Sequence, residues 1–472
     1  MTGCSMSETT TSMSIDRRPE KMLAVYVLLA ALAVGGIFLI RWVGESGQTT
    51  AVGTLATAKA EKPASHAVAH LLGGLVVVIV LARGLGVVLR QMGQPRVIGE
   101  VIAGIVLGPS ILGRISPETM EFIFPGTVQP LLNAIAQIGV ILYMFLVGLE
   151  LNASVLKERA HTTVMISHAS IAAPFLLGAV LALWLFQGYA PAGIPFTSFA
   201  MFLGLAMAIT AFPVLARILT DRGMERSELG MVALSCAAAD DVTAWCLLAV
   251  VVGVAKANLL GAMTTILLAL AYVAIMLCLV RPVVQRWAVQ GRAAAPTSDV
   301  IALSLVGVLA SALMTDLIGI HALFGAFLFG AIMPHDSHLA RAFRGKLEDV
   351  VTILLMPAFF AYTGLRTQIG LISAPADWVV CGTVIAVAIL GKLGASFAAA
   401  RYTGLDWRAS AALGILMNTR GLMELIVLNI ALDLGIISPA LFAMMVLMAL
   451  VTTMMTNPLL NLVMRPQEEG RS

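Results

Sequence analysis

Long runs of apolar residues, separated by short polar segments, follow one another along almost the whole chain. A helix needs about 20 mostly apolar residues to cross a bilayer, and only helices and closed barrels satisfy their backbone hydrogen bonds in lipid. The runs here are continuous and lack the alternation of a barrel strand. The pattern therefore predicts an all-α polytopic membrane protein with fourteen spanning helices, at residues 21–43, 66–90, 97–113, 129–150, 162–187, 197–217, 228–254, 261–281, 298–317, 319–334, 349–366, 377–400, 409–433 and 438–463.

The composition excludes several classes of protein. Apolar residues make up 59% of the 472 residues and charged residues 12%, whereas soluble domains carry about 25% charged residues. The mean hydropathy of +0.95 is too high for a surface that faces water. We therefore exclude a soluble enzyme, a nucleic-acid-binding protein and a disordered protein. The five cysteines form no CxxC pair, so we expect no disulfide and no metal cluster. We also expect no cofactor.

The lysines and arginines orient the predicted helices. With the N-terminus in the cytoplasm, twenty of them fall in segments on the cytoplasmic side and six in segments on the opposite side. Cytoplasmic loops carry an excess of Lys and Arg. We therefore predict a multi-pass protein of the inner (plasma) membrane with both termini in the cytoplasm.

The first predicted helix has a second interpretation. Arg17, Arg18 and Lys21 precede it, and Ala56-Thr57-Ala58 could mark the cleavage site of a signal peptide. The apolar stretch is longer than a usual signal sequence and this site lies far downstream, so we favour a retained helix. We divide the chain into residues 1–65 (cytoplasmic tail, extra helix and flexible linker), a transmembrane domain over 66–463 and a short cytoplasmic tail over 464–472.

Without the extra helix, thirteen helices remain, and they divide into six, one and six. We predict one repeat over 66–254, a linker helix over 261–281 and a second repeat over 298–463. A single helix between two six-helix halves turns the second half upside down, as in inverted-repeat transporters. We also expect two crossing helices in the core to be broken.

Two pairs of short segments resemble each other at matching places in the two halves. Residues 103–108 resemble residues 325–330 in the second helix of each half, and residues 145–149 resemble residues 361–365 in the third. Small residues spaced by three recur in any helical membrane protein, but the matching positions favour a true repeat.

Ionisable residues deep in a membrane helix are costly and are functional candidates by default. Asp240 and Asp241 lie deep in helix 228–254, and Lys392 lies in helix 377–400. Adjacent residues point about 100° apart around a helix, so one aspartate can pair with a fixed cation while the other faces a cavity. A lysine at that depth needs a partner or solvent to stay charged. A buried structural ion pair would explain one aspartate but not both.

Two helices contain polar or helix-breaking residues in their middle, each in the fifth position of its half. Pro213 in the first of them frees a backbone carbonyl about one turn upstream. Interrupted helices at corresponding repeat positions point to an ion site at the membrane midplane. The candidates for the interruptions are Ala211, Pro213, Asn418, Thr419 and Gly421. Arg420 and Glu424 can neutralise the exposed helix ends, and Thr210 joins Asp240 and Asp241 as a candidate cation or proton ligand.

Four features of the sequence carry a resemblance to a known family. They are the segment Val97–Ser110, which begins with Val97–Glu100 and ends with Leu107–Ser110, the pair Asp240-Asp241, the residue Lys392, and the segment Asn418–Asn429. The chain resembles the monovalent cation:proton antiporters of the sodium/proton exchanger superfamily, and it is especially similar to bacterial sodium/proton and potassium/proton antiporters and to plant cation/proton exchangers.

The resemblance implies an antiporter that exchanges Na⁺ or K⁺ for protons by alternating access, and not an enzyme. It implies that Asp241 binds the cation or the proton, that Asp240 pairs with Lys392, and that a core domain moves against a scaffold in a homodimer. Members with two adjacent aspartates tend to be electrogenic. Glu100, within the first motif, is a further candidate residue.

Two alternative functions belong to other classes of membrane protein. An intramembrane aspartyl protease would need two carboxylates that face each other from two helices, and the two aspartates here are adjacent on one helix. A sodium-coupled symporter of a small organic anion on a related fold would not need a lone proton-carrying aspartate beside a lysine. The residues alone leave open the choice between sodium and potassium, the stoichiometry and the pH range of activity.

Overall fold

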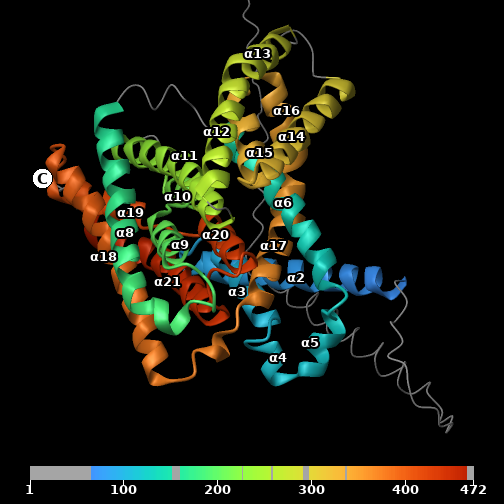
Figure 1. Cartoon of the computed structure of the whole chain (residues 1–472), viewed down its shortest axis with the longest axis vertical. Coiled ribbons are helices and arrows are strands. Elements are labelled where there is room, and N and C mark those ends of the chain that lie inside the picture. The colour runs from blue at the N-terminus through green and yellow to red at the C-terminus, as the bar shows by residue number, and fades with distance from the viewer. Residues whose placement is uncertain are drawn as a thin grey trace, which may run out of the picture. The chain divides into compact units, whose positions relative to one another are not determined.

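The computed structural model of this chain describes residues 65–150, 160–225, 227–256, 259–290, 297–334 and 337–464. All regular structure in these ranges is helical, which confirms the predicted all-α class (Figure 1). The helix predicted over 21–43, the linker that follows it and residues 465–472 lie outside the described residues. The choice between a retained helix and a signal peptide therefore stays open.

The described elements, in chain order, are α2 (Ser65–Gln91), α3 (Arg96–Leu107), α4 (Leu112–Ile115), α5 (Pro117–Ile123), α6 (Gln129–Glu150), α8 (Ala160–Tyr189), α9 (Phe196–Ala208), α10 (Phe212–Asp221), α11 (Glu228–Lys256), α12 (Leu259–Ile275), η1 (Met276–Val280), α13 (Arg281–Gln290), α14 (Ser298–Ile318), α15 (Ala322–Ile332), α16 (His338–Val350), η2 (Val351–Leu355), α17 (Met356–Arg366), η3 (Ile369–Leu371), α18 (Pro375–Tyr402), α19 (Trp407–Met417), α20 (Leu422–Asp433) and α21 (Pro439–Val463).

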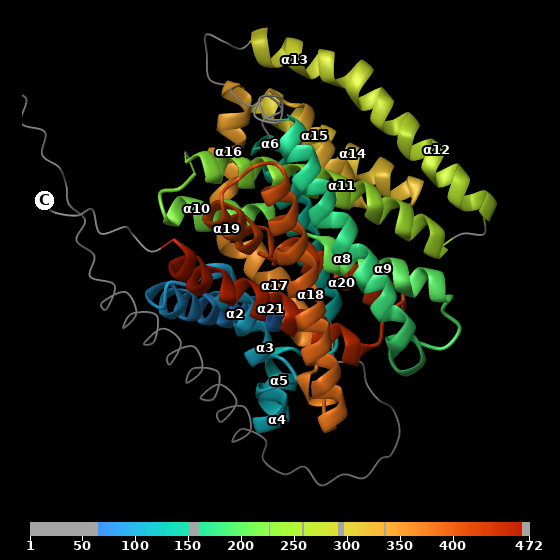
Figure 2. The ribbon, with the colours of Figure 1, turned by 90° about the vertical axis from the view of Figure 1, so that its left-hand side faces the viewer.

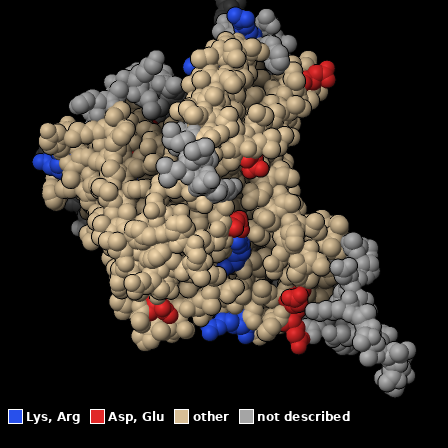
Figure 3. All heavy atoms as spheres, in the orientation of Figure 1, with Lys and Arg blue, Asp and Glu red and all other residues tan. Residues whose placement is uncertain are grey.

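Twelve helical stretches in the described residues are long and apolar enough to cross a membrane. They match twelve of the thirteen helices predicted between residues 66 and 463. The remaining prediction, over 319–334, corresponds to the shorter apolar helix Ala322–Ile332. The count of thirteen spans therefore stays a prediction. The face in Figure 3 shows few charged residues, as expected of a surface that lipid covers.

Two predicted boundaries are wrong for identifiable reasons. Helix α3 ends at Leu107 and not at residue 113, because Pro109 disfavours helical geometry in the residue before it. The helix predicted to begin at 349 begins at His338 and runs through α16, η2 and α17. Its first turns are amphipathic and charged, so a search for apolar runs passes over them, although Ser337 caps the helix by accepting the N–H of Ala340 at 3.1 Å.

The helices of the two halves pack in matching pairs. The first and second helices of each half pack together, as α2 with α3 and α14 with α15. The fourth helix packs against the fifth and the sixth, as α8 with α9 and α11, and α18 with α19 and α21. Between the halves, the second helix of one packs against the third of the other, as α3 with α17 and α15 with α6. A two-fold relation between the halves requires this arrangement, so it supports the predicted repeat.

The cross-half pairs depend on glycine. A Cβ at Gly364 on α17 would lie 2.0 Å from the carbonyl carbon of Gly104 on α3, and a Cβ at Gly148 on α6 would lie 2.2 Å from the carbonyl oxygen of Phe327 on α15. Neither position tolerates a side chain, because the two backbones touch. Gly104, Gly148 and Gly364 all belong to the segments that resemble each other between the halves. The resemblance thus corresponds to close helix contacts.

The helices form two bundles. The core bundle comprises α8, α9, α10, α11, α18, α19, α20 and α21, and the scaffold bundle comprises α2, α3, α6, α14, α15 and α17. The continuous helix α12–η1–α13 packs against α11 of the core and α14 of the scaffold (Figure 2). This helix extends to Gln290 and is therefore longer than the linker predicted over 261–281.

Candidate functional site

Two interrupted helices meet in the core bundle. Helix α9 ends at Ala208 and α10 begins at Phe212, while α19 ends at Met417 and α20 begins at Leu422. The backbone N–H of Ala211 in the first interruption donates to the carbonyl oxygen of Thr419 in the second at 3.0 Å. The candidate residues Ala211, Asn418, Thr419 and Gly421 all lie in these non-helical segments, and Pro213 lies in the first turn of α10.

The end of α9 leaves three backbone carbonyls without a partner in the helix, because the chain unwinds after Ala208. The guanidinium of Arg420 donates to the carbonyl oxygens of Ala206 and Met207, at 2.8 and 2.6 Å. The ammonium group of Lys392 donates to the carbonyl oxygen of Ala208. Two cations therefore satisfy the negative end of the α9 dipole inside the bundle.

Asp240 is fully buried and fully hydrogen-bonded. Its Oδ1 accepts from the hydroxyl of Ser167 at 2.6 Å, and its Oδ2 accepts from the hydroxyl of Ser170 at 2.7 Å. The same Oδ2 lies 2.8 Å from the Thr210 hydroxyl and 3.0 Å from Nζ of Lys392. The structure thus brings Asp240 and Lys392 into a buried ion pair. It also adds Ser167 and Ser170, which the sequence reasoning missed although their spacing of three places both on one face of α8.

Asp241 has the opposite environment. Its side chain is also buried, with 1% of the residue exposed, but neither carboxylate oxygen has a hydrogen-bond partner. The backbone N–H of Phe212 at the start of α10 is close to the carboxylate without reaching hydrogen-bonding geometry. A buried, unpaired carboxylate is costly as a bare anion. Burial of this carboxylate becomes favourable when a proton or a cation neutralises its charge.

Comparisons with known proteins show the family of this chain. The family model described as "Sodium/hydrogen exchanger, transmembrane" matches residues 74–462. The chain belongs to this family. The family predicted from the sequence motifs is thereby confirmed, and the exchanger is a transporter rather than an enzyme.

Named relatives extend the comparison. The Na(+)/H(+) antiporter NhaS4 of Synechocystis is 44% identical over 395 residues, which are 82% of this exchanger and 96% of the relative. The K(+)/H(+) antiporter 1 of Saccharomyces cerevisiae is 36% identical over 385 residues, or 79% of this exchanger and 46% of the relative. The exchanger thus spans about half the length of the yeast relative, and the same holds for the plant relative Cation/H(+) antiporter 17, of which it covers 50%.

A solved structure shows the same fold. The sodium proton antiporter MjNhaP1 from Methanocaldococcus jannaschii matches with a TM-score of 0.62 at 13% identity, over 84% of this exchanger and 96% of that chain. At this identity the match concerns the fold alone.

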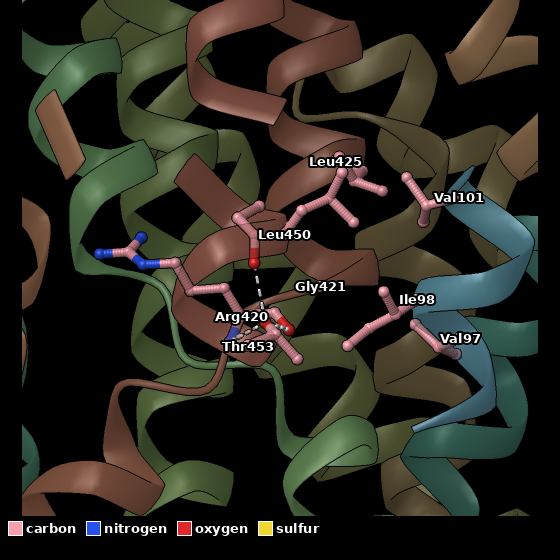
Figure 4. Close-up of a pocket in the computed structure, with 9 residues that line it drawn as sticks. Val97, Ile98, Val101, Arg420, Gly421, Leu425, Leu450 and Thr453 are labelled. Carbon is pink, nitrogen blue, oxygen red and sulfur yellow. Dashed lines mark hydrogen bonds between the residues drawn. The ribbon is translucent and has the colours of Figure 1, made fainter. Parts of the chain in front are cut away.

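The remaining candidate residues of the exchanger lie around Arg420. Its NH1 is 3.4 Å from Oε2 of Glu424, which lies in the first turn of α20. Both side chains are fully buried. Its backbone N–H donates to the hydroxyl of Thr453 on α21 at 3.1 Å. Figure 4 shows the guanidinium of Arg420 pointing away from Val97 and Ile98 of α3. Arg420 therefore holds the core together and faces away from the scaffold.

Glu100 lies apart from this constellation. It is partly buried on α3 of the scaffold bundle, and Arg83 and Arg96 are the charged residues near it. Among the described residues no hydrogen bond joins Glu100 to either aspartate. Likewise, no three His, Cys, Asp or Glu side chains in the described part of the chain gather as ligands of a resident metal ion.

Proposed function

We propose that this protein is a secondary active antiporter that exchanges a monovalent cation, Na⁺ or K⁺, for protons across the membrane by alternating access. The single observation that carries the proposal is the contrast between two adjacent buried carboxylates. Asp240 has hydrogen-bonding partners for both oxygens, and Asp241 has none. Asp240 is thereby occupied, whereas Asp241 is available for a mobile charge.

The proposed exchange follows from competition at one carboxylate. A proton and a cation each neutralise Asp241, so one leaves as the other arrives, and an empty anionic site is too costly to cross the membrane. Carboxylate, hydroxyl and backbone carbonyl oxygens are suitable ligands for a hard cation. We assign the cation to Asp241, with the Thr210 hydroxyl and the carbonyl groups of the two interruptions as further candidate oxygen ligands.

The other side chains have supporting roles in this proposal. Lys392 and Arg420 compensate the charge of the carboxylates and the end of α9, and Glu424 offsets Arg420. We further propose that the exchange is electrogenic, as the resemblance to members with two adjacent aspartates implies.

We propose that the core bundle carries the site across the membrane by moving against the scaffold bundle, in a homodimer held in the lipid bilayer. Part of the interface between the two bundles is apolar: Val97, Ile98 and Val101 of α3 face Leu425 of α20 and Leu450 of α21 across a cavity of about 10 Å³ (Figure 4). Contacts of this kind are non-directional, so they permit sliding.

The names of the relatives support a choice between two cations. NhaS4 is named for sodium and the yeast relative for potassium, so we propose one of these two ions, with pH homeostasis as the role. We place the protein in the inner (plasma) membrane with both termini in the cytoplasm, on the strength of the charge distribution. The relatives are named as cation/proton antiporters, and the comparisons give no support to the alternative of a sodium-coupled symporter of organic anions.

The test is cation-induced dequenching of a pH dye in everted vesicles, scanned over sodium, potassium and lithium. The wild-type protein should collapse a preformed pH gradient with at least one of these ions. Asp241→Asn should not, whereas the matched control Asp299→Asn, at an exposed position in the first turn of α14, should match the wild type. A wild-type protein that responds to none of the three ions would refute the proposal.

A further inference from the structure

A chain of polar contacts joins the two bundles at one end of the molecule. NH2 of Arg366, the last residue of α17, lies 2.7 Å from Oδ1 of Asp433, the last residue of α20. NH1 of Arg366 donates to Oδ1 of Asn429 at 3.1 Å, and Nδ2 of Asn429 donates to the hydroxyl of Thr363 at 2.9 Å. Each of these three contacts has one partner in the scaffold bundle and the other in the core bundle.

The chain of contacts runs from the surface to the interior. The Arg366 and Asp433 side chains are 21% and 46% exposed, whereas Asn429 and Thr363 are 4% and 0% exposed. The buried members therefore have few alternatives to each other as hydrogen-bond partners. Asn429 belongs to the motif Asn418–Asn429, and no part of the proposed ion site uses it.

Each bundle holds its own half of the cluster. The Arg366 guanidinium lies 5.3 Å from the centre of the Tyr362 ring, which is also on α17, a distance that suits a cation–π contact. Asn429 donates to the carbonyl oxygen of Leu425, one turn back on α20, at 2.9 Å. If the bundles separate, Arg366 stays with the scaffold and Asn429 stays with the core. The contacts between them are the part that must break.

We propose that Arg366, Asp433, Asn429 and Thr363 form an outer gate, which closes the access path on the side away from the cytoplasm and opens when the core bundle moves. This proposal rests on the proposed function, since a gate needs a moving core. The side follows from the charge distribution, which places the ends of helices 349–366 and 409–433 opposite the cytoplasm.

The contacts at the other end of the interface differ in kind. There, Nε2 of Gln94 donates to the carbonyl oxygen of Met454 at 3.1 Å, and Nδ2 of Asn457 donates to the carbonyl oxygen of Gly93. These contacts also join scaffold to core, but all of their groups are neutral. Charge-assisted hydrogen bonds are about twice as strong as neutral ones, and of the two closures between described residues only the outer gate contains such contacts.

A cross-link across the gate tests the proposal directly. In a background that lacks the five natural cysteines, Thr363→Cys with Asn429→Cys places one thiol on each bundle, and a short bifunctional methanethiosulfonate reagent joins the two through disulfide bonds. Tyr189→Cys with Asp377→Cys is the control, because the natural side chains are in contact at 2.8 Å and both belong to the core bundle. A bifunctional reagent is needed because a tyrosine side chain is longer than a cysteine, so a direct disulfide would not span this pair. In proteoliposomes, cross-linking should lower exchange by the gate pair at least tenfold, and reduction should restore it. The control pair should exchange equally well in both states.

The outcomes separate the gate from the proposed function. Exchange by the cross-linked control pair shows that the antiporter works in this background, so undiminished exchange by a fully cross-linked gate pair would overturn the gate alone. If the control pair and the wild type show no exchange, the proposed function fails instead.

A second measurement keeps the proposal testable if the gate pair does not fold. Arg366→Gln weakens the closed state, so it should increase the fraction of protein open to the outer side. The apparent affinity scales with the fraction of the binding-competent state. The apparent KM for external cation should therefore fall several-fold while that for internal cation rises. Asp433→Asn should act in the same direction. Equal changes on both sides would indicate a purely structural ion pair and would also overturn the gate.

Discussion

Asp240 and Asp241 are neighbours in the chain, have the same side-chain chemistry and are both buried, yet their surroundings are opposite. Asp240 accepts hydrogen bonds from Ser167, Ser170 and Lys392. Asp241 accepts none that meets hydrogen-bonding geometry. The rotation of about 100° between adjacent helical residues is enough to separate them. One carboxylate thus anchors the bundle, and the other is left for transport.

The first way to test this comparison is to remove the charge of Asp241 alone. Asp241→Asn keeps the shape of the side chain and breaks no hydrogen bond, so exchange should fall to background while the thermal melting temperature in detergent stays the same or rises. The dye assay in everted vesicles and a melt of the purified protein measure the two effects. Exchange at the wild-type rate by Asp241→Asn would show that the mobile charge sits elsewhere.

The second test removes the partners of the other carboxylate. Asp240→Ala or Lys392→Ala alone leaves a buried charge without its partner, which should lower the free energy of unfolding by about 3–5 kcal/mol. The double variant removes both charges and should recover part of this loss. Melting of the two single variants and the double variant in detergent gives the coupling free energy. Strictly additive losses would mean that the 3.0 Å contact contributes nothing.

The third test concerns the competition itself. A proton on Asp241 excludes the cation, so the apparent KM for the cation should rise as the pH falls. At pH values where the proton occupies most sites, the rise should be about tenfold per pH unit for one competing proton, and up to about a hundredfold for two. The maximal rate at saturating cation should change far less. Sodium and potassium titrations in proteoliposomes at a series of pH values measure both, and a constant KM with a collapsing maximal rate would point to a separate pH sensor.

The smallest expected effects separate the two serines. Ser167→Ala leaves Oδ1 of Asp240 without its hydrogen bond, which should destabilise the protein by about 1–3 kcal/mol. Ser170→Ala removes one of several donors near Oδ2, so its effect should be about 1 kcal/mol or less. Chemical or thermal unfolding of the two variants compares them. A larger loss for Ser170→Ala would reverse the assignment of donors to the two oxygens.

Much of the site was predictable because its signals are local. Pro213 cannot continue a helix and Gly421 weakens one, so the neighbouring sequence marks both interruptions before any fold is known. Ionisable groups such as Asp240, Asp241 and Lys392 stand out in apolar runs for the same reason. The repeated glycine segments, which pack Gly104 against Gly364, were also visible as a pattern of small residues.

The tertiary structure decided which of these groups meet. The apolar pattern could not show that Ser167 and Ser170 lie against Asp240, since the hydroxyl and carboxylate groups are 70 or more positions apart in the chain. The sequence assigned Arg420 to an exposed helix end without saying which one, and it gave no sign that Lys392 binds the end of α9 or that Arg366 reaches Asp433. Hydropathy and helix-breaking residues act within a few turns of one helix, whereas these contacts depend on how separate helices pack. The sequence by itself therefore determined the membrane helices, their interruptions and the buried charges. The family resemblance assigned Asp240 to Lys392, but only the packing of separate helices showed from geometry which carboxylate is bound and which has no partner.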